Sequence, residues 1–129
     1  MDAFEHEPLD IYQAAIEFVV LVDKLTKTFS PGRAYLADQL LQGATAMTRD
    51  IAAGASEFSD ADKARFLGEA RRSAVQCASL LDLCRSLNLA GEEQIASGRQ
   101  LLLQIVGGLT QLERALAGEN RAARGPRQG

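Results

Sequence analysis

Apolar residues recur every three or four positions through most of the chain, which is the spacing that places side chains on one face of an α-helix. Four such stretches follow one another, separated by short segments rich in glycine, proline, serine or asparagine. They predict helices over about 10–29, 34–53, 59–87 and 92–117. Short connections favour antiparallel neighbours, so we expect an all-α, up-down-up-down antiparallel four-helix bundle forming one domain over residues 1–117.

Each predicted helix contributes one apolar stripe to the expected core. In chain order the stripes are Ile11, Ala15, Phe18, Val22, Leu25 and Phe29; Leu36, Leu40, Ala44, Met47 and Ile51; Phe66, Ala70, Ala74 or Ser73, Cys77, Leu81 and Cys84, backed by Leu67, Leu80, Leu83 and Leu87; and Ile95, Leu102, Ile105, Leu109, Leu112 and Leu116. The last stripe repeats every seven residues, as in helices that pack along a continuous seam. Gly98, Gly107 and Gly108 interrupt it, and close backbone packing would explain their presence.

Polar residues at the expected helix ends predict how the helices start and stop. Asp10 and Ser59 stand where N-caps belong, and Asp60 and Asp62 follow Ser59 in the first turn, where carboxylates meet the positive end of the helix dipole. Gly54 stands where a left-handed C-terminal cap would end the second helix.

The first helix is apolar beyond the arc needed to meet one core, because Ile16, Val19 and Val20 lie beside its main stripe. Two interpretations are open: the helix is buried on all sides within the bundle, or it also faces a second subunit. Leu41 in the second helix adds apolar area where another helix or subunit could cover it. These four residues form the candidate oligomer or partner surface.

Composition agrees with a globular helical protein, since 47% of the 129 residues are hydrophobic, 24% are charged and only three are proline. The net charge is −3, but residues 121–129 carry three arginines and no acid, which leaves −6 on the rest of the chain. An acidic body argues against broad, sequence-independent phosphate binding. Residues 118–129 lack an apolar pattern and are expected to form a flexible basic tail.

Basic residues gather in two places, the third helix and the tail. The candidate basic patch consists of Lys63, Arg65, Arg71, Arg72, Arg121, Arg124 and Arg127. The simpler interpretation is a solvated helix face, because Asp62 and Glu69 are interleaved with these cations. The alternative is a contact surface for nucleic acid or an acidic partner, since phosphate binding needs several cations on one face.

No arrangement of side chains in the sequence predicts catalysis, a metal site or a cofactor. Because Cys77 and Cys84 lie on the core stripe, we expect them to be small buried residues. About 10.5 Å of helical rise separates them, which is too far for a disulfide between them. His6 is the only histidine and has no nucleophile or base arranged around it. Asp50 would need a cation or hydrogen-bond donors if it were buried.

The start of the chain predicts no secretory signal, because residues 1–8 are acidic and lack an apolar stretch. The most apolar run, 16–22, is far shorter than the roughly 20 residues that cross a membrane. We therefore expect a cytoplasmic protein without a membrane partner.

Three segments resemble a family of small bacterial four-helix bundles first named for proteins encoded in intervening sequences of large-subunit ribosomal RNA genes. The matching residues are Phe4, Leu9, Tyr12 and Gln13; Tyr35, Gln39, Leu40, Ala44, Met47, Asp50, Ile51, Ala52 and Gly54; and Phe66, Leu67, Ala70, Ser73 and Gln76. The accessory variability proteins of diversity-generating retroelements look like relatives. The resemblance implies a homopentamer shaped like a tapered barrel, and its retroelement branch implies nucleic-acid binding beside a reverse transcriptase.

The chain departs from the family pattern at charged positions. Leu41 and Gln42 replace two arginines, Asp50 replaces an asparagine, Ala53 replaces the glutamate before Gly54, and Gln76 replaces a glutamate. Because the two arginines are lost from an already acidic body, we favour a non-enzymatic homo-oligomeric scaffold or adaptor that binds a protein partner. A nucleic-acid-binding accessory factor is the alternative.

Overall fold

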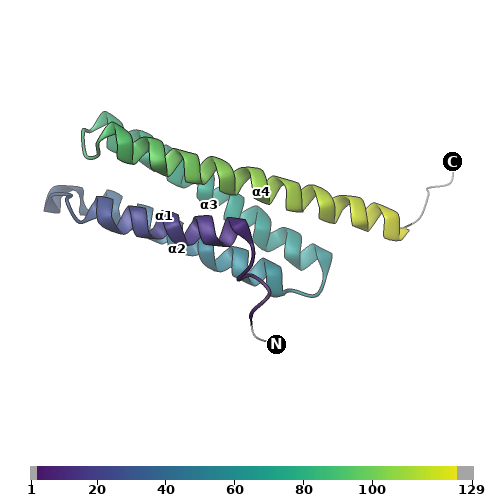
Figure 1. Cartoon of the computed structure of the whole chain (residues 1–129). Helices are drawn as coiled ribbons and strands as arrows, with labels where there is room; N and C mark the ends of the chain where they lie inside the picture. Colours follow the sequence, from purple (N-terminus) through teal and green to yellow (C-terminus); the bar gives the residue numbers. More distant parts are fainter. Residues whose placement is uncertain (1–2, 125–129) are drawn as a thin grey trace.

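The computed structural model describes residues 3–124, with side chains described through residue 118. It contains α1 (Asp10–Thr26), α2 (Ala34–Ser56), α3 (Asp60–Ser86) and α4 (Glu92–Arg124), with a 3-10 helix, η1 (Pro31–Arg33), between α1 and α2. Successive helices run in opposite directions (Figure 1). The predicted all-α four-helix bundle is confirmed.

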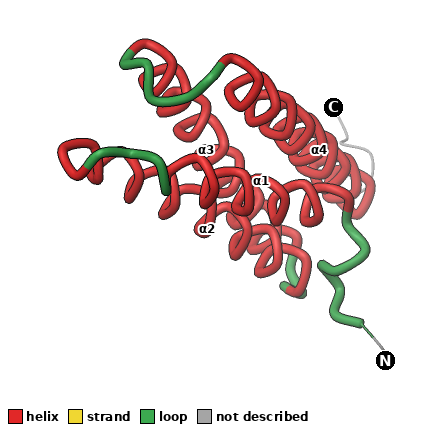
Figure 2. Tube along the Cα trace, turned by 60° about the vertical axis from the view of Figure 1, so that its left-hand side comes forward, coloured by secondary structure: helices red, strands yellow, loops and turns green. Residues whose placement is uncertain are grey.

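The helices form a closed cycle of contacts, in which α1 packs on α2 and α4, and α3 packs on α2 and α4. Within residues 3–124 the backbones of the diagonal pairs, α1 with α3 and α2 with α4, do not approach each other. The α1–α2 and α3–α4 connections lie at one end of the bundle and apart from each other, whereas α4 projects beyond the other helices at the opposite end (Figures 1 and 2). The bundle therefore consists of two helical hairpins that diverge toward their turns.

The predicted stripes supply the core. Fully buried side chains come from all four helices and include Phe18, Val22, Leu40, Met47, Ile51, Cys77, Leu81, Ile95, Ile105 and Leu109. The seven-residue repeat of the fourth helix thus faces the interior through most of its length. Two threonines are also buried, and each hydroxyl donates to a carbonyl one turn earlier, Thr26 to Val22 O at 2.8 Å and Thr48 to Ala44 O at 2.8 Å.

The third stripe differs from its prediction at its edges. Leu67 is buried, whereas Phe66 is only half-buried and lies under the Arg65 guanidinium, 4.5 Å from the ring centroid. Leu83 and Leu87, expected to back the core, are exposed. Leu83 lies on the outward face of α3, about 200° around the helix from buried Leu81 and in line with exposed Gln76 and Ser79. Leu87 directly follows α3, where the hairpins diverge (Figure 2).

The helix ends confirm one predicted cap and correct two others. Ser59 caps α3, since its hydroxyl oxygen accepts a hydrogen bond from the Asp62 N–H at 3.1 Å. Asp10 is not a cap but the first residue of α1, which begins after Leu9. Gly54 does not end α2, because the helix continues to Ser56 and buries this glycine against the Leu67 side chain, which lies 3.1 Å from the position of a Cβ.

The last helix is longer than predicted. α4 runs to Arg124, seven residues past the expected end at 117, so its backbone includes the start of the segment expected to be a flexible tail. The rest of that segment, 125–129, lies outside the described residues.

The third helix ends at a residue with a left-handed backbone. Asn88 adopts a φ of 58°, and the Leu89 N–H donates to Cys84 O at 2.8 Å, as in a Schellman motif.

Candidate interaction surfaces

Three glycines lie where helices cross closely. A Cβ at Gly43 of α2 would lie 2.7 Å from the Cys77 sulfur, and a Cβ at Gly98 of α4 would lie 2.9 Å from Cδ1 of Leu81. A Cβ at Gly108 would overlap the Ile11 side chain of α1. The close packing expected at Gly98 and Gly108 is therefore present.

Gly107 differs from its neighbour, because nothing in the described structure lies within 4 Å of where its Cβ would be. It is exposed on the outer side of α4, in the middle of a helix, where glycine costs roughly 1 kcal/mol relative to alanine. Packing within the bundle thus gives no reason for a glycine here.

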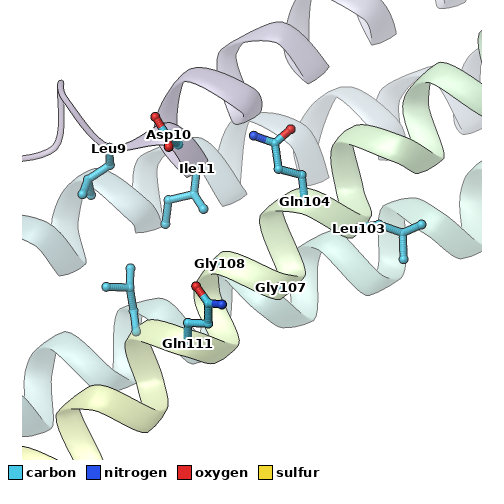
Figure 3. Close-up of a pocket in the computed structure, with 9 residues that line it drawn as sticks. Leu9, Asp10, Ile11, Leu103, Gln104, Gly107, Gly108 and Gln111 are labelled. Atoms are coloured by element: carbon cyan, nitrogen blue, oxygen red, sulfur yellow. The ribbon is translucent and has the colours of Figure 1, made fainter.

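Gly107 opens onto a groove of about 470 Å³ between the start of α1 and the middle of α4 (Figure 3). Its lining is apolar at the base and carries amides and one carboxylate; the residues are Leu9, Asp10, Ile11, Leu103, Gln104, Gly107, Gly108, Gln111 and Leu112. Leu103 stands at one side of this groove and points away from α1 (Figure 3). Its side chain is 67% exposed.

A second, smaller groove of about 180 Å³ lies on the other side of Leu103, between α3 and α4. It is lined by Ala74, Val75, Ala78, Arg99, Leu102, Leu103 and Val106. Ion pairs that join the two helices flank it along α4, one between Arg99 and Asp82 at 3.5 Å and one between Arg71 and Glu113 at 2.9 Å.

The candidate oligomer or partner surface divides into an exposed part and a packed part. Ile16 and Val20 are 39% and 48% exposed, and their four-residue spacing puts them on one face of α1. Val19 and Leu41 are half-buried and pack against the core. Of the two interpretations open for the first helix, burial on all sides is wrong for Ile16 and Val20.

The candidate basic patch is spread around α3 rather than gathered on one side. The Arg71 guanidinium points to Glu113 of α4, and their hydrogen bond raises the pKa of Arg71. Arg65 pairs with Asp62 at 3.6 Å, and the Lys63 ammonium donates to Ala55 O at 3.3 Å at the α2–α3 corner. Neither Lys63 nor the exposed Arg72 has an ion-pair partner among the described side chains.

The side chains of the three tail arginines in the candidate basic patch are not described. Arg121 and Arg124 continue the backbone of α4 but their side chains are not described, and Arg127 lies outside the described residues. The predicted basic patch therefore stays a prediction.

Comparison with known sequences identifies the chain. The profile of the 23S rRNA-intervening sequence proteins matches residues 7–111, from the end of the lead-in to the second half of α4. The chain belongs to this family. No match was found among curated proteins. The family is one of small helical proteins and is not known as an enzyme family.

The residues of this family member that were considered for catalysis or metal binding lie in surroundings that suit a structural role. Cys77 and Cys84 are unpaired and fully buried, and burial raises the pKa of Cys77 to about 11 and also raises the pKa of Cys84. His6 packs against the rings of Phe4 and Tyr12, with centroids 5.9 and 4.5 Å away. No cluster of three metal-ligating side chains occurs in the part of the chain that the structure describes, nor does any helix there have the length and apolar character to cross a membrane.

Asp50 is the carboxylate with the least favourable surroundings. It is half-buried on α2, and its pKa is raised first by burial and then by Glu69 of α3, with Arg49 opposing the shift. Its folded pKa lies above the ordinary 3.8, so the stability that protonated Asp50 contributes is present below pH 3.8 and is lost as pH rises through the folded pKa. At neutral pH the ionised carboxylate therefore opposes folding.

We expect Asp50→Asn to raise the free energy of unfolding at pH 7, because the amide keeps the shape and removes the charge; asparagine is also what the family pattern has here. The gain should shrink as pH falls toward 3.8. Urea denaturation of both proteins at several pH values measures it. Asp38→Asn is the control, since Asp38 is exposed on the same helix. A gain at pH 7 that persists unchanged at low pH would contradict this account of Asp50.

Leu103 and Gly107 were not recognised from the sequence as surface features, because Leu103 falls next to the seven-residue repeat and Gly107 beside a glycine that does pack. A signal was available. From Gln100 to Leu112 the fourth helix carries no charged residue, although part of this stretch must face water.

Proposed function

We propose that this chain is a non-enzymatic, homo-oligomeric scaffold of the cytoplasm, pentameric as the family resemblance implies, that binds a protein partner. The observation that carries the proposal is the exposed apolar pair on α1, Ile16 and Val20. Burying apolar surface between subunits stabilises an assembly by about 25 cal/mol per Å². The two unpaired, buried cysteines suit a reducing compartment.

A pentameric ring requires two different faces on each subunit, since each copy contacts the next head to tail. The α1 face is one candidate, and exposed apolar side chains on other helices, such as Val75 of α3, supply a second apolar face. The nucleic-acid alternative has no observation in its favour, because Arg65 and Arg71 are paired with acids and the body of the chain is acidic.

The test is the mass of the native protein. Light scattering after gel filtration should give several times 13.9 kDa, and five times for a pentamer. Ile16→Glu together with Val20→Glu should lower that mass, because charges on the α1 face cannot be buried without partners. Gln39→Glu with Gln76→Glu adds the same charge at exposed positions of α2 and α3 and should leave the mass unchanged. A wild-type protein that is monomeric at micromolar concentration would end the proposal.

A further inference from the structure

The outward face of α4 is uncharged over several helical turns. Its exposed residues through this region are Gln100, Leu103, Gln104, Gly107 and Gln111, which recur every three or four positions and form one stripe. Solvated helix faces usually carry Lys and Glu, whereas charged residues are depleted from the cores of protein interfaces. The stripe therefore has the composition of a covered surface although no described residue of the chain covers it.

The stripe combines one protruding and one recessed position. Leu103 protrudes with most of its side chain in water. One turn later Gly107 leaves a gap, with no atom within 4 Å of its missing Cβ and a groove beside it whose base includes Leu9, Ile11 and Leu112 (Figure 3). Gly98 and Gly108 are explained by neighbours within the bundle, and Gly107 is not.

The four-residue spacing of these two positions makes the stripe complementary to itself. When two α4 helices cross in opposite directions on their outward faces, about a two-fold axis at the level of residue 105, Leu103 of each copy lies over Gly107 of the other, as a two-fold contact requires. We infer that the α4 stripe is a two-fold docking surface for a second copy of this chain, with the Leu103 side chain of each copy seated in the groove beside Gly107 of its partner.

The charges at the ends of the stripe agree with this direction. The stripe begins near Glu93 and ends near Arg114, both exposed and neither ion-paired among the described side chains. They are separated by about 31 Å of helical rise. An antiparallel pair places Glu93 of one copy toward Arg114 of the other at both ends, whereas a parallel pair would place like charges together. The occupant that fits is therefore an antiparallel second α4.

This contact rests on the self-association put forward under the proposed function, but it uses α4 rather than the α1 face. Rings and two-fold contacts can coexist in one assembly of dihedral symmetry. The α4 contact can accordingly fail while the oligomer itself persists, and the test separates the two.

The test is disulfide crosslinking between differently tagged copies that are expressed together, one carrying Leu103→Cys and the other Gly107→Cys. Mild oxidation should link the two variants several-fold more efficiently than either variant expressed alone, because residues 103 and 107 face each other across the axis while two copies of residue 103 lie too far apart for a disulfide. Cys77 and Cys84 are fully buried and do not compete. Circular dichroism of each variant checks that the helices form.

A second measurement covers the case in which a cysteine substitution itself disturbs the α4 contact. Leu103→Lys should lower the native mass, and Gln39→Lys, which adds the same charge at an exposed polar position of α2, should not. Absence of the mixed crosslink in a protein that is still oligomeric overturns the α4 contact and leaves the proposed function standing. Crosslinking only between two copies of residue 103 overturns the register. A monomeric wild-type protein overturns both proposals.

Discussion

Replacing Phe18 by alanine is expected to lower the free energy of unfolding by about 3–5 kcal/mol. Phe18 is fully buried on α1, and its ring lies 3.6 Å from the position of a Cβ at Gly98, so it fills the space that this glycine leaves between α1 and α4. The remaining contacts hold α1 and α4 in place, so the helices cannot close the cavity that the missing ring leaves. Chemical denaturation at one fixed protein concentration, followed by circular dichroism, measures the loss.

The chain offers a matched control for this substitution. Phe58, in the connection between α2 and α3, is 100% exposed, so Phe58→Ala removes the same atoms from water rather than from the core. Its effect should stay within about 0.5 kcal/mol. Similar losses for the two substitutions would show that Phe18 does not occupy the core as described.

Adding one methyl group to each of two adjacent glycines is expected to change stability in opposite directions. Gly108→Ala forces a Cβ into the Ile11 side chain and should cost about 1–3 kcal/mol, as overpacking does. Gly107→Ala meets open space and should stabilise the fold by roughly 0.5–1 kcal/mol, because alanine favours the helix. Denaturation of the two variants at low protein concentration makes the comparison.

A double-mutant cycle locates the cause of the loss at Gly108. Ile11→Ala removes the atoms that the new Cβ would meet, so Gly108→Ala should cost less in that background than in the wild type, with a coupling of at least 0.5 kcal/mol as expected for residues in contact. Equal costs in both backgrounds would mean that α1 and α4 do not approach each other at this point.

The period of the apolar residues was enough to predict the helices and nearly all of the core. Phe18, Met47, Ile51 and Leu109 were expected inside on spacing alone, and each is fully buried. The expectation failed at Leu83, which was grouped with the core stripe because it is apolar and not because of its spacing. Leu83 lies two residues from buried Leu81, about 200° around α3, so the same period places it on the outward face, where it is exposed.

The glycines mark a different limit of sequence analysis. Gly54 has the sequence context of a C-terminal cap, yet the helix continues because Leu67 packs against it and compensates for the poor helical preference of glycine. Gly107 and Gly108 are indistinguishable in sequence and differ only in what their missing Cβ atoms would meet. The uncharged stretch from Gln100 to Leu112 marks the surface on α4 in the sequence, but which of its two glycines is recessed depends on how α1 and α4 cross.

The closed cycle of helix contacts also bears on the order of folding. Three of its four contacts join helices that follow one another in the chain, and only the α1–α4 contact joins segments far apart in sequence. Hairpins of neighbouring helices form quickly. Bringing α1 and α4 together costs loop entropy before their contact stabilises the chain. The contact of Ile11 with Gly108 belongs to that closing step. A substitution there should then act mainly by speeding unfolding, so that α1, once released, exposes the core to proteolysis.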